Sequence, residues 1–247
     1  MGVFHTSRWL HSRRGLLAGM VATGFLAGFP GIKGDVLAQA AGLRVPFGPD
    51  LAGQGWEHMT FRRIPPTEYA AAGPNELAIT ARASSSLIHR PLPETAFDLR
   101  RASWRWRVDE GVPATDLSQR GGDDRAIAIY FAFAPESERA RAAAGRTNLR
   151  RLLMSGSGYI LVYVWGGAGA PGTIVPNPYT RGRGVYLIQR PASSGTGQWQ
   201  SERVDLAADH QRAFGQPSGI LVGLAIASDS DDMDGLNRAR IADLTIS

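Results

Sequence analysis

Cysteine is absent from the 247 residues of this chain, and lysine occurs only once, at position 33. The absence of cysteine excludes disulfide bonds and thiolate metal sites. Arginine is therefore the only basic residue after position 33, which together with the abundant alanine and glycine indicates a compositional bias. Three histidines follow residue 40, and their wide spacing matches no metal-binding motif. We interpret His58, His89 and His210 as ordinary structural residues.

Several catalytic and nucleotide-binding motifs are also missing. The chain has no phosphate loop, no dinucleotide fingerprint and no zinc-protease H-E-x-x-H. In Ser155-Gly156-Ser157-Gly158 the glycines flank Ser157 directly, which does not match the spacing of a serine-hydrolase elbow. The formal net charge is +5, but residues 1–40 carry four basic residues and one acidic residue, so the remainder has a net charge of +2. That near balance gives no bulk attraction for nucleic acid.

The N-terminal segment has the pattern of an export signal. Arg13 and Arg14 precede an uncharged apolar run, 16–29, and the small-residue site Ala38-Gln39-Ala40 follows it. This order is typical of a cleaved signal, and the arginine pair indicates the twin-arginine route. An uncleaved anchor and an ordinary helix are the alternatives, although the run is shorter than the roughly 20 residues of a membrane span. We predict a twin-arginine-type signal over 1–40, with the export machinery as a partner and a periplasmic or secreted location after export.

The remaining residues, 41–247, predict a single all-β domain, a jelly-roll-like antiparallel β-sandwich with one or two short peripheral helices. Four runs alternate with the period of a strand: 103–108, 125–133, 158–165 and 220–227. Trp104 and Trp106 share one face of the first run, where core packing is the favoured interpretation. Helices are expected over 135–145 and 205–214, each bounded by proline, glycine or acidic residues in the usual positions. No later segment is long and apolar enough to span a membrane.

The three later strands each have two low-charge faces. We expect the aliphatic face of each strand, such as Ile160, Val162 and Val164, to form the sandwich core. The other face then carries small residues together with Tyr130, Tyr163 and Trp165. Two interpretations stay open for that face, since it could form a groove for a flat ligand or be covered by a helix or loop.

Two acidic loops lie beside these strands, at 121–124 and 229–235. Calcium takes several oxygen ligands from flexible loops. The second loop does not match the helix–loop–helix calcium pattern, because the twelfth position is Ile241 instead of a glutamate. A different calcium site, using Asp229, Asp231 and Asp232, is one interpretation. The other is an Asp-rich turn whose carboxylates accept backbone N–H bonds.

Several motifs together resemble a known family. They run from Gly55-Trp56-Glu57 through Trp104-Arg105-Trp106, Gly122-Asp123-Asp124, Tyr163-Val164-Trp165, Pro176-Asn177-Pro178-Tyr179-Thr180 and Asp229-Ser230-Asp231 to the terminal strand. In these motifs the chain is similar to the exported bacterial family designated domain of unknown function 3047, over nearly all of 55–247. The resemblance implies a jelly-roll-like β-sandwich and brings no established activity with it.

We therefore expect a non-catalytic module that binds a carbohydrate or another cell-envelope ligand. The predicted ligand-binding residues are Tyr130, Tyr163, Trp165 and Tyr179 for stacking, and Asp123, Asp124 and Arg203 for hydrogen bonding. One alternative is a polysaccharide hydrolase or lyase that uses Asp124, Asp209 or His210 as acid or base. Another alternative is a structural or assembly protein of the envelope.

Overall fold

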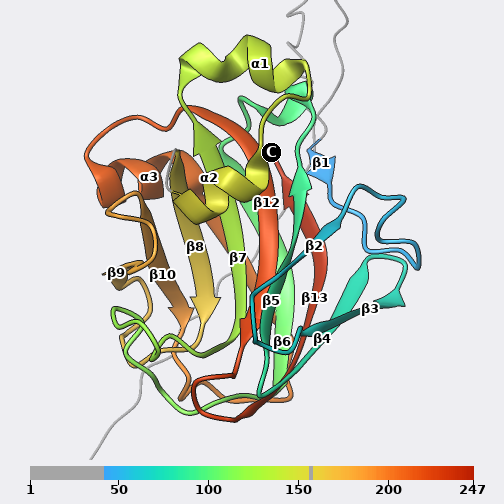
Figure 1. The fold of residues 1–247 in the computed structure, drawn as a ribbon, viewed down its shortest axis with the longest axis vertical. Coiled ribbons are helices and arrows are strands. Elements are labelled where there is room, and N and C mark those ends of the chain that lie inside the picture. The colour runs from blue at the N-terminus through green and yellow to red at the C-terminus, as the bar shows by residue number, and fades with distance from the viewer. Residues whose placement is uncertain (1–41, 156–157) are drawn as a thin grey trace, which may run out of the picture. The chain divides into compact units, whose positions relative to one another are not determined.

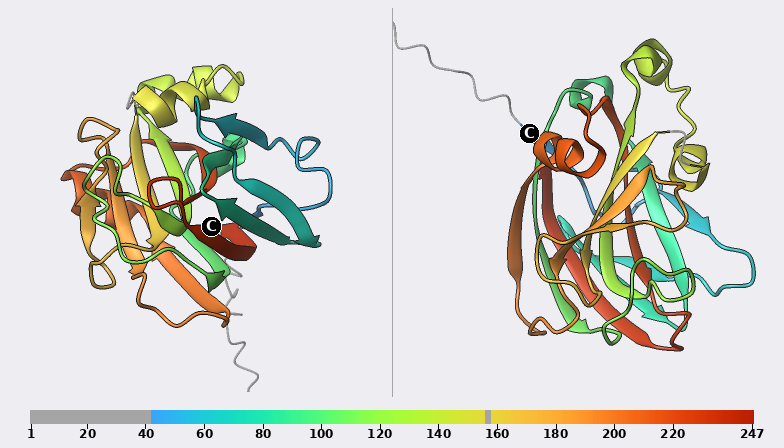
Figure 2. Two further views of the ribbon diagram at one scale, coloured as in Figure 1. Left: turned by 60° about the horizontal axis from the view of Figure 1, so that its bottom comes forward. Right: turned by 90° about the vertical axis from the view of Figure 1, so that its left-hand side faces the viewer.

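Two β-sheets face each other in this computed structural model, which describes residues 42–155 and 158–247. The predicted signal over 1–40 lies outside the described residues and stays a prediction. Figures 1 and 2 show the two layers, with the short helices at one end and along one face. Among the described residues, no helix is long and apolar enough to cross a bilayer.

The six-stranded sheet has the order β11-β6-β13-β4-β3, with β1 also paired to β13. Its strands are β1 (Leu43–Arg44), β3 (Glu68–Gly73), β4 (Glu76–Arg82), β6 (Arg101–Glu110), β11 (Gln200–Asp205) and β13 (Leu236–Ile246). All of its pairings are antiparallel. Strand β6 alternates between buried and more exposed residues, because one of its faces packs on the other sheet.

The seven-stranded sheet has the order β2-β5-β12-β7-β8-β10-β9. Its strands are β2 (Glu57–Thr60), β5 (Ser85–Pro91), β7 (Arg125–Ala134), β8 (Tyr159–Trp165), β9 (Ile174–Pro176), β10 (Gly184–Arg190) and β12 (Ile220–Asp229). Strands β8 and β10 run parallel, and every other pair in this sheet is antiparallel. The all-β sandwich is thus confirmed, with one parallel pair that the sequence did not predict.

Both faces of the central strands β7 and β12 are buried along their whole length. One buried cluster fills the space between the sheets, and a second lies on the outer face of the seven-stranded sheet. Helix α2 (Leu149–Ser155) covers part of that outer face and contributes Leu149, Leu152 and Leu153 to the second cluster. A helix therefore covers part of the second face, as one of the two open interpretations had it.

The sequence predicted correctly which face of β7 points into the core between the sheets, and it predicted the wrong face for β8. Ile127, Ile129, Phe131 and Phe133 of β7 belong to the core between the sheets, as predicted. On β8 the order is reversed, because Tyr163 and Trp165 point into that core and Ile160, Val162 and Val164 point outward. The ring of Tyr163 lies 5.5 Å from that of Trp104, and Trp165 lies 5.8 Å from Trp106. These large rings fill the space between the sheets.

The remaining helices are short and peripheral. They are η1 (Glu94–Ala96), η2 (Glu136–Glu138), α1 (Arg139–Ala143) and α3 (Leu206–Phe214). Helix α3 begins after Asp205, whose side chain accepts the backbone N–H of Ala208 at 2.9 Å, and it ends at Gly215, where φ is +68°. Both features are the expected helix signals. The predicted helix 135–145 is present as η2 followed by α1, and α2 was not predicted.

Candidate functional site

A cavity of about 330 Å³ opens on the outer face of the seven-stranded sheet, at the end where β7 begins and β12 ends. Its walls combine apolar and aromatic side chains with charged ones. The lining residues are Phe61, Ile64, Ser85, Leu87, Asp123, Arg125, Tyr130, Leu153, Asn177, Tyr179, Thr180, Tyr186, Asp229, Asp231 and Asp232. A concave, largely apolar site with a few convergent polar groups is the usual form of a small-ligand site.

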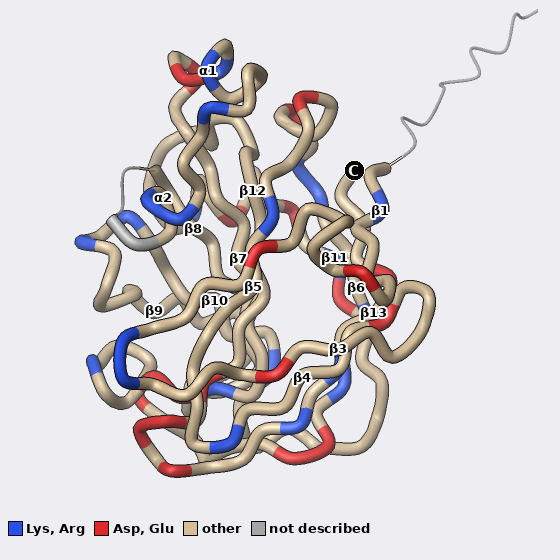
Figure 3. The backbone as a smooth tube through the Cα atoms, turned by 45° about the vertical axis from the view of Figure 1, so that its right-hand side comes forward, with Lys and Arg blue, Asp and Glu red and all other residues tan. Residues whose placement is uncertain are grey.

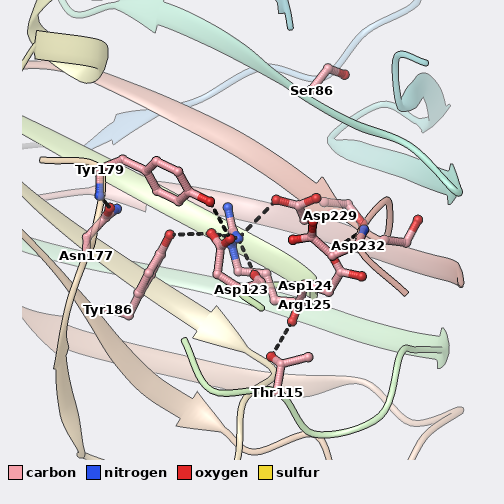
Figure 4. Close-up of polar contacts among 12 residues, drawn as sticks. Ser86, Thr115, Asp123, Asp124, Arg125, Asn177, Tyr179, Tyr186, Asp229 and Asp232 are labelled. Atoms are coloured by element: carbon pink, nitrogen blue, oxygen red, sulfur yellow. Dashed lines mark hydrogen bonds and ion pairs between the residues drawn. The ribbon is translucent and has the colours of Figure 1, made fainter. Parts of the chain in front are cut away.

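A buried arginine, Arg125, organises the charged side of the cavity. Its Nη1 donates to the Asp123 carboxylate at 3.0 Å and to the Asp229 carboxylate at 3.2 Å. Its Nη2 donates to the Tyr130 hydroxyl at 2.7 Å, and its guanidinium lies 5.1 Å from the centre of the Tyr186 ring. Figure 4 shows the guanidinium between Asp123 and Asp229. Arg125 therefore ties the start of β7 to the end of β12 and to β10.

Asp123 is bonded from two further sides by tyrosines. The hydroxyl of Tyr179 donates to its Oδ1 at 3.0 Å, and the hydroxyl of Tyr186 donates to its Oδ2 at 2.9 Å. Burial, and then the charge of Asp123, raise the pKa of Tyr179 to about 12, so its hydroxyl stays a donor at neutral pH. Tyr179 is 44 % exposed, so it is a cavity residue that a ligand can reach. These bonds fix the orientation of both rings before any ligand arrives.

The two acidic loops meet through Asp124. Its carboxylate accepts the backbone N–H of Met233 at 2.9 Å and that of Asp232 at 3.3 Å. Its backbone carbonyl accepts the Thr115 hydroxyl at 2.7 Å. For Asp124 this is the arrangement of an Asp-rich turn, which was one of the two open interpretations. The side chain lies behind the cavity wall and supports the loop.

Asp229 differs from its neighbours because one oxygen is unused. Its residue is 8 % exposed, Oδ2 accepts from Arg125, and the buried Oδ1 has no hydrogen-bond partner among the described residues. Burial raises the pKa of Asp229 to about 7, while the positive charge of Arg125 opposes that shift. A side-chain hydrogen bond with Asp231 adds to the upward shift, so Asp229 keeps its proton to a higher pH than a free aspartate does.

A cation could be held by a neighbouring set of carboxylates. Asp124, Asp231 and Asp232 can each offer an oxygen, and these oxygens lie within 4.8 Å of one another. This differs from the set predicted from sequence, because Asp229 faces Arg125 and Asp124 takes its place. The spacing suits a calcium ion, whose oxygen ligands lie about 2.3–2.6 Å from it.

The structure brings most of the predicted site residues together. Tyr130, Tyr179, Asp123, Asp229, Asp231 and Asp232 all line the cavity, and Asp124 lies directly behind it. Tyr163 and Trp165 do not share this face, so that expectation is wrong. They are 0 % and 1 % exposed in the core between the sheets, where they pack on Phe131 and Trp106. Arg203 is exposed on β11, in the other sheet.

The candidate acid–base residues Asp209 and His210 lie on α3, and they do not line the cavity. Asp209 accepts the Tyr163 hydroxyl at 2.7 Å and pairs with Arg212 at 3.1 Å. His210 is buried between Phe133, Tyr159 and Phe214, and its Nδ1 is bonded to the carbonyl of Gln216 at 2.9 Å. Both side chains support packing.

Sequence reasoning missed Arg125, Tyr186 and Asn177 as site residues. Arg125 begins a strand and Tyr186 lies inside one, so both read as ordinary strand positions. A signal was nevertheless present, because Asp123-Asp124-Arg125 is a run of charges leading directly into a strand that is otherwise entirely apolar. Burying such a charge is costly unless it is paired, so an arginine at that point predicts carboxylate partners.

Three solved structures are similar to the chain at low identity. The first is the xyloglucanase domain of NopAA, a type three effector from Sinorhizobium fredii, in complex with cellobiose, at 10 % identity over 78 % of this chain and 92 % of that chain, with a TM-score of 0.42. The second is the catalytic domain of Humicola grisea Cel12A, at 15 % identity over 73 % of this chain and 84 % of that chain, with a TM-score of 0.37. The third is a cellulase derived from Cel12A of Rhodothermus marinus, at 13 % identity over 84 % of this chain and 99 % of that chain, with a TM-score of 0.38. The search of curated proteins gave no match.

A family model matches most of the chain, over residues 54–245. This range includes every strand of the seven-stranded sheet and every residue that lines the cavity. The resemblance inferred from the sequence motifs is thereby confirmed. The chain belongs to the family described as Protein of unknown function (DUF3047).

Proposed function

We propose that this domain is a non-catalytic carbohydrate-binding module and that the cavity around Arg125 is its ligand site. The observation that carries the proposal is that one cavity is lined both by tyrosine rings, those of Tyr130, Tyr179 and Tyr186, and by carboxylates. A sugar ring has apolar C–H faces that pack on aromatic rings, and hydroxyl groups that bond to carboxylates. The cavity offers both kinds of contact within one small space.

The fixed geometry of the site supports binding. Arg125, Asp123 and Tyr186 are already held by mutual hydrogen bonds, so a ligand would not have to order them. Pre-ordered side chains lower the entropic cost of association. Among the lining residues, the free oxygen of Asp229 and the carboxylates of Asp231 and Asp232 remain to accept bonds from a ligand.

Calorimetric titration of the purified protein with a panel of envelope and plant oligosaccharides tests this proposal. We expect one glycan class to bind, and Tyr179→Ala to weaken that binding at least tenfold, which is about 1.4 kcal/mol. The matched control is Trp199→Ala. Trp199 lies under Arg105 at 5.0 Å, as Tyr179 lies under Arg120 at 5.4 Å, but Trp199 is outside the cavity. Equal affinities of the Tyr179→Ala and Trp199→Ala proteins would contradict the proposal.

A hydrolase or lyase is the second candidate, and Asp229 favours it. A carboxyl group with a pKa of about 7 and an unused oxygen in a cavity has the properties of a general acid. Under this alternative, the wild-type protein releases reducing ends or unsaturated sugars from its glycan. Asp229→Asn would then abolish release and keep affinity within a few fold. A wild-type protein that binds the glycan and releases nothing supports the binding module.

We also propose that the chain is exported by the twin-arginine machinery and acts in the periplasm or outside the cell. The Arg13-Arg14 pair, the apolar run after it and the Ala38-Gln39-Ala40 site support this. Replacing both arginines by lysine should leave the protein in the cytoplasm, whereas the wild type should appear outside the inner membrane with Ala41 as its first residue. Fractionation and N-terminal mass spectrometry measure both outcomes.

A further inference from the structure

The cavity carries an excess of negative charge. Four carboxylates line it, those of Asp123, Asp229, Asp231 and Asp232, together with one guanidinium, that of Arg125. Arg125 pairs with Asp123 and Asp229. Asp231 and Asp232 have no ion-pair partner in the described part of the chain. The rest of the domain does not share this sign, because residues 41–247 as a whole have a net charge of +2.

Carboxylates of like charge crowd together at this end of the cavity. Asp124, Asp231 and Asp232 each offer an oxygen, and these oxygens lie within 4.8 Å of one another. The groups that face Asp229 are Arg125 and Asp123 from the start of β7 and Asp231 from its own loop. A cation placed among these carboxylates would relieve their repulsion.

The shape of the cavity indicates what kind of cation fits. Its volume of about 330 Å³ exceeds the space that an ion needs, and its apolar walls include Phe61, Ile64, Leu87 and Leu153. The unused Oδ1 of Asp229 is a buried acceptor at the same site, independent of the exposed carboxylate of Asp232. Figure 4 shows Asp229 and Asp232 on one side of the guanidinium and the rings of Tyr179 and Tyr186 on the other. An organic ligand with one positively charged end fits this arrangement, because its charge would face the carboxylates and its remainder would face the tyrosine side.

We propose that the glycan recognised here carries a free, protonated primary amine, as in a hexosamine unit without its acetyl group. This inference rests on the carbohydrate-binding function proposed above. The ammonium group has three N–H donors and no acceptor. It would donate to Asp229, Asp231 and Asp232, while the sugar ring packs against Tyr179, the exposed tyrosine of the cavity. Acetylation removes the charge and two of the donors, so an acetylated unit would leave these carboxylates without a cation.

Titration calorimetry with three oligosaccharides of equal length tests the inference: glucosamine, N-acetylglucosamine and glucose oligomers, at neutral pH and in chelator. We expect the glucosamine oligomer to bind at least tenfold more tightly than the other two. We expect Asp231→Asn and Asp232→Asn, alone or together, to remove that preference. Asp234→Asn is the matched control, because Asp234 belongs to the same exposed loop and does not line the cavity.

The outcomes separate this inference from the proposed function. Equal binding of charged and neutral oligomers would overturn the amine requirement and leave carbohydrate binding in place. Failure of all glycans, including the panel above, would overturn both. A repeat with calcium in place of chelator adds one more outcome. If the wild-type protein shows no preference for the glucosamine oligomer in chelator, and calcium binds and raises its affinity for all three oligomers alike, the acidic cluster is a metal site and the amine inference is wrong. Melting temperatures of the variants confirm that they fold.

Discussion

At the scale of single residues, Arg125 holds the candidate site together through its contacts with four side chains. It is buried, it donates hydrogen bonds to the carboxyl groups of Asp123 and Asp229 and to a tyrosine hydroxyl, and it lies over a second tyrosine ring. A buried ion pair adds little stability by itself, because desolvation offsets the attraction. Removing one member is costly, because the remaining charges stay buried without a partner.

Arg125→Met should therefore lower the free energy of unfolding by about 3–5 kcal/mol, measured by urea denaturation. Methionine keeps much of the side-chain volume and removes the charge. The matched control is Arg105→Met, which breaks a pair with Asp243 that is largely exposed, at 2.7 Å. That change should cost about 1 kcal/mol or less. Similar losses in the two variants would show that Arg125 does not organise a buried network.

The raised pKa of Asp229 predicts that this side chain stabilises the folded protein more at low pH than at neutral pH. Its pKa is about 7 in the folded protein and about 3.8 as a free side chain, so the folded state holds a proton that the unfolded state releases. This contribution to stability is present below about pH 4 and is lost as the pH rises to about 7. Asp229→Asn cannot titrate. The unfolding free energy of the variant minus that of wild type should rise between those pH values and then level off, whereas parallel curves would contradict the assignment.

At the scale of elements, α2 forms part of the wall of the cavity. Leu153 of α2 lines the cavity, and Leu149 packs where Gly223 of β12 leaves room. A Cβ atom at position 223 would lie 2.5 Å from Leu149 Cδ2, so the Leu149 side chain keeps its present position only because residue 223 has no side chain. The sheet thus sets where α2 lies.

Gly223→Ala should push α2 outward, lower the unfolding free energy by about 1–3 kcal/mol and weaken glycan binding. Gly195→Ala is the matched control, because no heavy atom lies within 4 Å of the added Cβ and the glycine lies in the loop between β10 and β11. Urea denaturation and calorimetry measure the two effects. Unchanged affinity with reduced stability would show that α2 does not shape the cavity.

The elements also show which parts of the fold could be predicted. The alternation in β6 and β7, and the cap residues Asp205 and Gly215 of α3, are local signals, and each gave the right element. The face of β8 that points into the core could not be predicted from the sequence. Both faces of this strand are apolar, and the alternation with a period of two does not tell them apart. Strand β12 has an irregular register between Leu221 and Gly223, and the alternation expected from sequence breaks there.

At the scale of the whole molecule, the candidate site lies at one end of the sandwich, opposite α1 (Figure 1). Acidic residues occur in several loops at that end (Figure 3). The acidic loops could be predicted because glycine and aspartate mark turns in the sequence. Their meeting at Arg125 could not, because β7 and β12 are neighbours only in the folded sheet. Tyr179 was predicted as a site residue and Tyr186 was not. Tyr186 lies on β10, and β10 reaches the site only because it pairs in parallel with β8, which the sequence did not predict.

A crystal structure of the protein soaked with its tightest-binding glycan tests the central claim most directly. The account predicts a sugar ring in the cavity, in contact with Tyr179 and within hydrogen-bond distance of Asp229 or Asp231. A glycan bound elsewhere, with the cavity around Arg125 holding only water, would contradict it.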